Sequence, residues 1–255
     1  MNLPIRDWQG KRVWIIGASS GIGAATARLL LSRGALVGLS ARNVDKLQEV
    51  SAAHANASIA PLDVTDIDSI RSAHAGLLTQ WQAIDLVLIV AGSYVEMRAD
   101  SFDLAAAQKL VDTNFNGVLR CLDVALPGLL QRGAGGIGIV SSVAGYRGLP
   151  KALAYGPGKA ALINLCESLF LDLRPRGISV YLITPGFVET PLTAGNDFPM
   201  PALMSPEQAA QELVAGVQRG DFLIHFPRRF TNVVRLMRLL PYRLYFALTH
   251  KATGL

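Results

Sequence analysis

Three polar side chains suggest acid–base chemistry. Tyr155 and Lys159 stand at positions i and i+4, which places them on one face of a helix if this segment is helical. A free tyrosine is too weak an acid to exchange protons at neutral pH, but a neighbouring ammonium stabilises the phenolate and lowers the pKa of the phenol. Ser142 lies upstream, directly after an expected strand. We therefore predict that these three residues interconvert a carbonyl and an alcohol.

A glycine-rich turn follows the first expected strand. It reads Gly17-Ala-Ser-Ser-Gly21-Ile-Gly23, and a helical pattern begins at once. Glycines let the chain turn tightly and let a pyrophosphate approach the backbone, and a helix N-terminus offers free N–H groups. We therefore predict a dinucleotide site here, with a purely structural turn as the alternative. The expected contacts are Gly17, Ser19, Ser20, Gly21, Ile22 and Gly23.

The end of the second expected strand indicates which dinucleotide binds. Dinucleotide-binding folds place an acid there to hold the ribose 2′-hydroxyl of NAD, whereas an arginine suits the 2′-phosphate of NADP. Here Ala41 stands in place of the acid and Arg42 follows it. An arginine fork matches phosphate geometry. We predict NADPH/NADP+ as the cofactor, with Ser40, Arg42 and Asn43 in contact; alternatively, Arg42 only caps a solvated helix start.

These residues need a scaffold that brings strand ends together. Short apolar runs alternate with longer helical patterns along the chain. This pattern indicates right-handed crossovers and a parallel sheet buried on both faces. We predict an α/β fold, a Rossmann-type doubly wound parallel sheet in a single domain, with binding at the carboxyl ends of its strands. The expected strands are residues 13–16, 36–41, 58–62, 86–90, 137–141, 178–184 and 222–226, and the main expected helices are 24–33, 44–54, 104–132 and 153–173.

The composition fits one folded domain of 255 residues. Hydrophobic residues make up 51% and charged residues 17%, which excludes a disordered chain. No apolar run reaches about 18 residues and no leader is evident, so we expect a cytoplasmic protein. Cys121 and Cys166 lack metal-ligand spacing. Both are expected to be buried free thiols, and no metal is predicted.

Positive charge is concentrated in the C-terminal segment, residues 228–255, which we expect to be a helical extension of a catalytic domain spanning 1–227. No acidic residue follows Asp221, and Pro241 should divide the segment into two short helices. Cations interleaved with bulky apolar residues are typical of helices in a membrane interface. Two interpretations remain open: peripheral membrane contact through residues 228–250, or packing on a partner subunit or over the active site. Nucleic acid is disfavoured because aliphatic residues interrupt the basic cluster. The cations are Arg228, Arg229, Arg235, Arg238, Arg243 and Lys251.

Taken together, the motifs resemble the short-chain dehydrogenase/reductase family along nearly the whole chain. In family order they are Gly17-x3-Gly21-Ile22-Gly23, Asp63-Val64, Ala91-Gly92, Asn114, Ser142, Tyr155-x3-Lys159 and Pro185-Gly186-x3-Thr190. The resemblance implies the strand order 3-2-1-4-5-6-7 and assembly into a homodimer or homotetramer.

The resemblance also implies a role for each site residue. Tyr155 would donate the proton, Ser142 would hydrogen-bond the substrate oxygen, and Lys159 would hold the nicotinamide ribose and tune Tyr155. Asn114 would anchor a water that feeds the proton relay. The adenine and ribose would lie against Asp63, Val64, Ala91 and Gly92, and the nicotinamide against Pro185, Gly186, Val188 and Thr190.

Two segments depart from the family's pattern. Ile16 stands where the family has Thr, and Ile89-Val90-Ala91-Gly92 replaces an Asn-Asn-Ala-Gly run. Replacing both members of a polar pair costs little, whereas restoring one leaves an unsatisfied group. We therefore hypothesise a compensated swap, in which restoring Asn at position 90 alone destabilises the fold.

The loops beyond the strand ends, at about residues 94–100, 143–153 and 192–205, should select the substrate. They carry few fixed charges, although Arg98 and Lys151 could contact a distant anionic group. We predict NADPH-dependent reduction of a lipophilic ketone or aldehyde (a 3-oxo lipid, a steroid-like compound or a xenobiotic) through a Ser-Tyr-Lys-Asn relay. The alternatives are a non-catalytic NADP(H)-binding sensor or scaffold, and a membrane-interaction protein acting through its tail. The candidate lid residues are Phe198, Pro199, Met200, Pro201, Leu203 and Met204.

Overall fold

A seven-stranded parallel sheet organises the computed structural model, which describes residues 1–196 and 199–254. The order of the strands reverses between the first and fourth, and the carboxyl ends of the strands leave a crevice at such a switch point. The predicted fold class and strand order are therefore confirmed. Across the sheet the strands are β3 (Ala57–Ile59), β2 (Leu36–Ser40), β1 (Arg12–Ile16), β4 (Leu86–Ile89), β5 (Gly135–Val140), β6 (Ile178–Pro185) and β7 (Leu223–Phe226).

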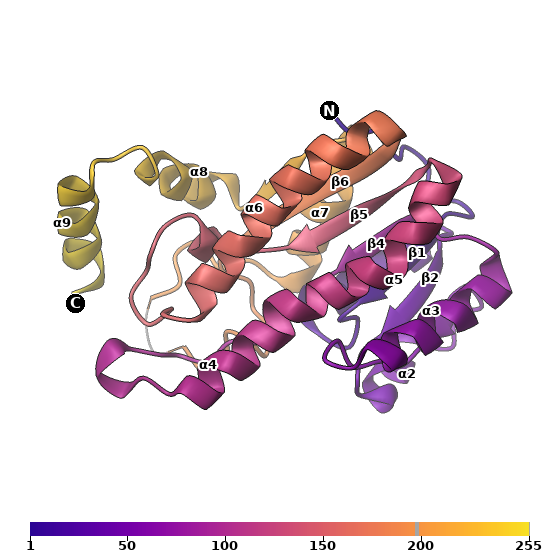
Figure 1. Cartoon of the computed structure of the whole chain (residues 1–255), viewed down its shortest axis with the longest axis horizontal. Coiled ribbons are helices and arrows are strands. Elements are labelled where there is room, and N and C mark those ends of the chain that lie inside the picture. Colours follow the sequence, from indigo (N-terminus) through magenta and orange to yellow (C-terminus); the bar gives the residue numbers. More distant parts are fainter. Residues whose placement is uncertain (197–198, 255) are drawn as a thin grey trace.

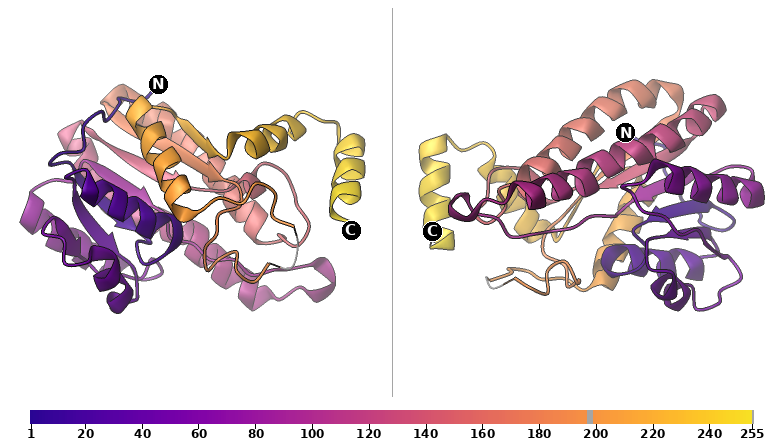
Figure 2. Two further views of the ribbon diagram at one scale, coloured as in Figure 1. Left: turned by 180° about the vertical axis from the view of Figure 1, so that it is seen from behind. Right: turned by 60° about the horizontal axis from the view of Figure 1, so that its bottom comes forward.

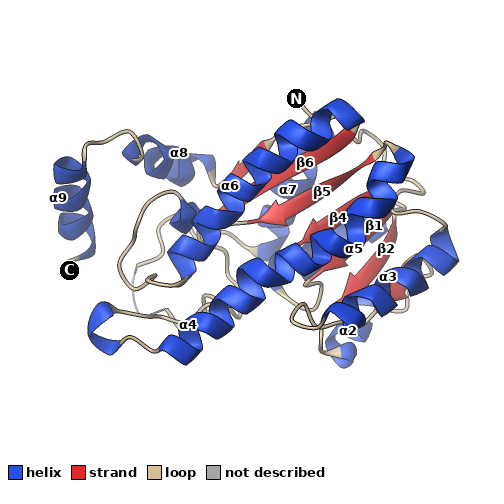
Figure 3. Cartoon of the chain, viewed as in Figure 1, coloured by secondary structure: helices blue, strands red, loops and turns tan. Residues whose placement is uncertain are grey.

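Helices cover both faces of this sheet (Figures 1 and 3). One face packs against α3 (Ile67–Trp81), α5 (Gly117–Arg132) and α6 (Tyr155–Leu173). The other packs against α1 (Gly21–Ser32), α2 (Val44–Ser51) and α7 (Pro206–Arg219). Because both faces are covered, the strands are apolar rather than alternating, and every residue of β6 is buried. Cys121 and Cys166 are buried free thiols, as predicted.

The helix predicted over residues 104–132 is interrupted. It consists of α4 (Leu104–Val111), a π-helical turn over Asp112–Asn116, and α5. A π turn inserts an extra residue into a helix and changes where the following side chains point. The single-helix prediction is therefore wrong at this turn, which contains Asn114.

Two helices follow the last strand: α8 (Arg228–Met237) and α9 (Tyr242–Thr253). Pro241 directly precedes α9, which confirms the predicted division of the segment. Figures 1 and 2 show that both helices reach beyond the sheet, with α9 standing at the far end of the molecule. We call residues 228–254 the C-terminal arm. Within the described ranges, no helix combines the length and the hydropathy needed to cross a bilayer.

Candidate active site

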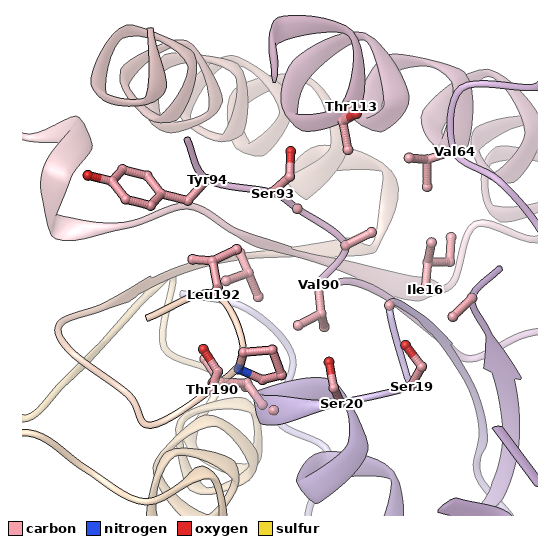
Figure 4. A pocket seen from close by; sticks show the side chains of 18 of the residues that line it. Ile16, Ser19, Ser20, Val64, Val90, Ser93, Tyr94, Thr113, Thr190 and Leu192 are labelled. Atoms are coloured by element: carbon pink, nitrogen blue, oxygen red, sulfur yellow. The ribbon is translucent and has the colours of Figure 1, made fainter. Parts of the chain in front are cut away.

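A cavity of about 890 Å³ opens at the carboxyl ends of the strands (Figure 4). Ser19 and Ser20 lie on one wall, and Ser93 and Thr113 lie on the opposite wall. The cavity brings together most of the residues predicted from the sequence, and three of them lie outside its lining: Gly23, Ser40 and Asn114. The predicted residues that line it are Gly17, Ser19, Ser20, Gly21, Ile22, Arg42, Asn43, Asp63, Val64, Ala91, Gly92, Ser142, Tyr155, Lys159, Pro185, Gly186, Val188 and Thr190.

The glycine turn forms a cradle of bare backbone, because a Cβ atom at any of its three glycines would collide with neighbouring atoms. Gly17 has φ +98°, and a Cβ atom there would lie 2.5 Å from the amide nitrogen of Ala91. A Cβ on Gly21 would lie 2.7 Å from Cγ2 of Thr190, and one on Gly23 would lie 2.1 Å from the carbonyl oxygen of Gly17. Gly23 therefore lets α1 begin in close contact with the backbone of the turn, while Gly17 and Gly21 leave backbone open to the cavity.

The N-terminus of α1 meets this cradle without a competing anion. Its first turn contains no acidic residue, and the side chain of Ser20 makes no capping hydrogen bond. Unpaired N–H groups at the positive end of a helix bind phosphate groups. The cradle and the helix end together fit the pyrophosphate of a dinucleotide.

Cationic side chains lie where β2 ends. Arg42 is 79% exposed, and its Nη1 atom is 3.9 Å from Oδ2 of Asp63. An exposed pair at this distance holds its partners weakly, which leaves the guanidinium available to a ligand. Lys46 also lines the cavity. Sequence reasoning missed it, although it stands in the first turn of the helix that follows Arg42.

Two neighbours of Arg42 serve the scaffold. Asn43 caps α2, because its side-chain oxygen accepts a 2.9 Å hydrogen bond from the amide of Lys46. The predicted contact between Ser40 and the cofactor is wrong. The hydroxyl of Ser40 is fully buried, accepts a 2.8 Å hydrogen bond from Nε1 of Trp14, and donates to the carbonyl of Ala60. It thus satisfies an indole inside the core.

The three candidate catalytic side chains meet at one wall of the cavity. Tyr155 is the first residue of α6, Lys159 lies one turn later, and Ser142 follows β5. The hydroxyl groups of Ser142 and Tyr155 are hydrogen-bonded to each other. The Nζ atom of Lys159 lies 5.6 Å from the centre of the Tyr155 ring and donates a 2.9 Å hydrogen bond to the carbonyl of Val140.

Burial governs the titration of these groups. Burial, with a smaller contribution from neighbouring Tyr94, raises the pKa of Tyr155 to about 12, although the hydrogen bond with Ser142 acts in the opposite direction. Burial also lowers the pKa of Lys159 to about 8. We predicted that Lys159 would lower the pKa of the phenol below its usual value. That prediction is wrong for the protein without bound cofactor: desolvation of the phenolate is the largest effect on the pKa of Tyr155, and it raises the pKa.

Asn114 lies buried behind the cavity wall. Its side-chain amide donates to the carbonyl of Ser93 and accepts from the amide of Ser93, both at 2.8 Å. A Cβ atom on Gly92 would lie 3.2 Å from Oδ1 of Asn114 and 3.6 Å from Nζ of Lys159. The amide therefore fixes the chain after β4 close to the Lys159 ammonium, and its predicted role in holding a water remains a prediction.

Residues outside the motifs also line the cavity. Tyr94, Val95 and Leu192 lie in the loops expected to select the substrate, whereas Lys109 and Leu110 were missed by sequence reasoning. Tyr94 packs edge-on against Tyr155 with ring centres 5.1 Å apart. The remaining wall is largely apolar, and Lys109 is the cation near it on α4. These residues carry no motif, so only the topology brings them together. The apolar wall includes Val90, Val95, Leu110 and Leu192.

The predicted substrate loops are only partly at the cavity. Tyr94 and Val95 of the first loop and Leu192 and Thr193 of the last line it. Phe198 of the candidate lid lies outside the described residues. Arg98 and Lys151 border a separate cavity of about 320 Å³. There Arg98 pairs with Asp100 at 3.6 Å and Lys151 pairs with Glu96 at 3.1 Å.

The structure shows which residue of the run at the end of β4 pairs with Ile16. Ile16 of β1 pairs in register with Ile89 of β4, and both belong to the core beneath α3, α5 and α6. Val90 packs toward the opposite core because successive side chains of a strand alternate. Position 89 of the run is therefore the partner of Ile16, and the destabilisation expected from Asn at position 90 remains a prediction.

Comparison with known proteins identifies the family. The family model for short chain dehydrogenases matches residues 11–198. An uncharacterized oxidoreductase of Myxococcus xanthus is 36% identical over 237 residues, covering 91% of this chain and 94% of the relative. One from Mycobacterium tuberculosis is 33% identical over 242 residues, covering 92% and 95%.

Solved structures agree. A short chain dehydrogenase/reductase family protein has a TM-score of 0.74 at 28% identity, over 86% of this chain and 96% of its own. A short-chain dehydrogenase from Streptomyces avermitilis has a TM-score of 0.83 at 24% identity, over 95% and 98%. The second likeness concerns the fold alone.

Proposed function

Because the chain belongs to the short chain dehydrogenase family of oxidoreductases, whose members use a nicotinamide dinucleotide, we propose that it reduces lipophilic ketones or aldehydes with NADPH. One observation carries this proposal: Ser142, Tyr155 and Lys159 converge in the cavity that also contains the glycine cradle. A protein that only binds a nucleotide has no use for a buried phenol hydrogen-bonded to a serine at that place.

The rim of the cavity supports NADPH over NADH. Arg42 and Lys46 offer two cations near the end of β2, and Ala41 stands where an acid would repel a phosphate. Asp63 lies 3.9 Å from Arg42, a weak and exposed pair that a 2′-phosphate can displace.

The titration of Tyr155 suits reduction. When bound, the nicotinamide supplies the hydride that forms the new C–H bond. The phenol holds its proton at neutral pH because burial raises its pKa to about 12, so the proton is present for donation to the substrate oxygen. Ser142, hydrogen-bonded to the same phenol, orients that oxygen. Lys159 carries positive charge near pH 7 and stabilises the phenolate that the transfer leaves.

The walls around Tyr155 support a lipophilic substrate. Tyr94 packs against the phenol ring, and Val95, Leu110 and Leu192 line the same cavity. Arg42 and Lys46 lie near the end of β2. Apolar walls with a few polar groups fix a hydrophobic ligand and orient its reacting atom. Long-chain 3-oxo lipids, steroid-like ketones and xenobiotic carbonyls all fit this description.

A panel of hydrophobic ketones and aldehydes tests the proposal. Each compound is incubated with the protein and NADPH, or with NADH, and the loss of reduced-nicotinamide absorbance is followed. We expect turnover of at least one compound class, faster with NADPH than with NADH. Tight NADPH binding without turnover of any compound would favour a nucleotide sensor instead.

A further inference from the structure

The C-terminal arm exposes large apolar side chains. Their exposed fractions run from 48% at Leu248 to 80% at Leu239. Exposed apolar groups gathered in one segment, rather than scattered singly, mark an interaction surface. The others are Val233, Leu236, Tyr242, Leu244 and Phe246.

The arm is nevertheless held in place at its base. Nη1 of Arg147 donates to the carbonyl groups of Met237, Arg238 and Leu240, at 3.2, 3.3 and 2.7 Å. The guanidinium also lies 4.2 Å from the ring centre of Tyr245. Such a clasp fixes the direction of the arm without covering its apolar groups.

A second hydrogen bond joins the arm to the same loop. The hydroxyl of Tyr245 donates a 2.6 Å hydrogen bond to the carbonyl of Gly148. Gly148 and Arg147 belong to the loop that begins after Ser142. The arm is therefore anchored at the carboxyl edge of the sheet (Figure 1). Its exposed apolar groups are available to an outside surface.

The charge of the arm indicates what that surface is. Cations are interleaved with the exposed apolar groups, and the chain contains no acidic residue after Asp221. A two-fold contact between two arms would bring like charges together without a carboxylate to pair them. A bilayer that contains anionic lipid attracts the cations and accepts the apolar side chains. The exposed cations of the arm include Arg229, Arg238 and Arg243.

We propose that the C-terminal arm docks this protein on an anionic membrane surface, with its apolar side chains inserted among the lipids and its arginines at the headgroups. The clasp by Arg147 then holds the carboxyl edge of the sheet toward the bilayer. This inference does not depend on the reaction that the cavity catalyses.

Vesicle co-sedimentation tests the proposal. The full chain is mixed with vesicles of equal parts phosphatidylcholine and phosphatidylglycerol, or of phosphatidylcholine alone. We expect binding to the anionic vesicles, little binding to the neutral ones, and weakening by added salt. Protein that stays in solution with both vesicle types would overturn the proposal.

Matched variants assign the binding to the arm. Arg229→Gln/Arg243→Gln removes charge, and Leu239→Gln/Leu244→Gln removes exposed apolar groups. Each should reduce partitioning at least about tenfold. The control Arg28→Gln/Leu171→Gln changes an exposed cation and an exposed leucine on the body of the protein and should bind as the wild type does. Arm variants that bind vesicles as well as the wild type would contradict the proposal.

Light scattering tests whether the arm binds a second copy of the chain instead of a membrane. All of these substitutions replace exposed side chains, so each variant should keep its melting temperature. If the wild type does not bind vesicles but forms an oligomer, and the arm variants remain monomeric, then the arm binds a second copy of the chain and the membrane proposal is wrong.

Discussion

The ammonium group of Lys159 lies 5.6 Å from the centre of the Tyr155 ring, and its 2.9 Å hydrogen bond goes to the carbonyl of Val140. We therefore propose that Lys159 acts on the phenolate through its charge rather than through a hydrogen bond to the hydroxyl. Burial favours the neutral forms of both groups, raising the pKa of Tyr155 and lowering that of Lys159. The phenol of Tyr155 therefore keeps its proton at neutral pH. This arrangement favours delivery of a proton to a carbonyl oxygen.

Arg42 should determine the choice of dinucleotide. We expect Arg42→Ala to raise the KM for NADPH about tenfold and to leave the KM for NADH unchanged, because a charge-assisted bond to the 2′-phosphate is lost. Lys46→Ala should give a smaller rise. Steady-state kinetics with both dinucleotides measures this, and equal effects on the two would contradict a role in reading the phosphate.

Lys159 should make the stability of the cofactor-free protein depend on pH. Its pKa falls from 10.5 to about 8 on folding, so the unfolded chain binds more protons and the cost of burying the charge declines as pH rises from 8 to 10. We expect Lys159→Met to be more stable than the wild type near pH 7. This advantage should shrink by about 2 kcal/mol between pH 8 and 10.

Urea unfolding of both proteins across this range provides the measurement. Cys121 and Cys166, whose pKa burial raises to about 12, lower the stability of both proteins as pH rises, so the difference between the two curves isolates Lys159. A difference that stays constant with pH would show that Lys159 is not desolvated.

Acid should loosen the base of the C-terminal arm at His225. Nδ1 of His225 lies 2.7 Å from Oγ1 of Thr231, and Nε2 lies 3.0 Å from Nη1 of Arg235. Burial lowers the pKa of His225, Arg235 and then Arg228 lower it further, and Asp221 opposes them. Stability that depends on neutral His225 is therefore present above its ordinary pKa of 6.5 and is lost as pH falls.

Hydrogen exchange of α8 measures this effect. Corrected for intrinsic rates, protection of residues 228–237 should fall severalfold between about pH 7.5 and pH 5.5. His225→Asn should remove the dependence because it cannot gain a charge. Protection that is equal at both pH values in the wild type would contradict the prediction.

The apolar pair of Ile16 and Ile89 should be sensitive to a single polar substitution. Ile89→Asn places an amide in the core next to Ile16 and should lower the free energy of unfolding by about 3 kcal/mol. Val90→Asn lies at the half-buried cavity wall and should cost less. Denaturant unfolding of the two variants compares them, and an equal cost would undermine the pairing of positions 16 and 89.

Much of the fold could be predicted because local sequence patterns determine its strands and turns. The continuous apolar run of β6 requires burial on both faces, and the turn from Gly17 to Gly23 needs glycine wherever a Cβ atom would collide. These constraints act within one strand or one turn, so the sequence alone is enough to detect them.

The remainder depends on contacts that no local pattern encodes. The hydroxyl of Ser40 accepts a hydrogen bond from Trp14 on the neighbouring strand. The side-chain amide of Asn114 is hydrogen-bonded to Ser93 in the chain after β4. The spacing of Tyr155 and Lys159 indicated their proximity, but not that burial would dominate their titration. Register and desolvation follow only from the packed structure.

Turnover by Tyr155→Phe tests whether the phenol of this residue supplies the proton in carbonyl reduction. The variant keeps the ring and loses the hydroxyl that holds the proton, so we expect kcat with a reducible ketone to fall about 100- to 10,000-fold while the affinity for NADPH is kept. Tyr94→Phe, which removes a hydroxyl from the same wall of the cavity, should retain most of the activity. A Tyr155→Phe variant that reduces the ketone as fast as the wild type would contradict the account.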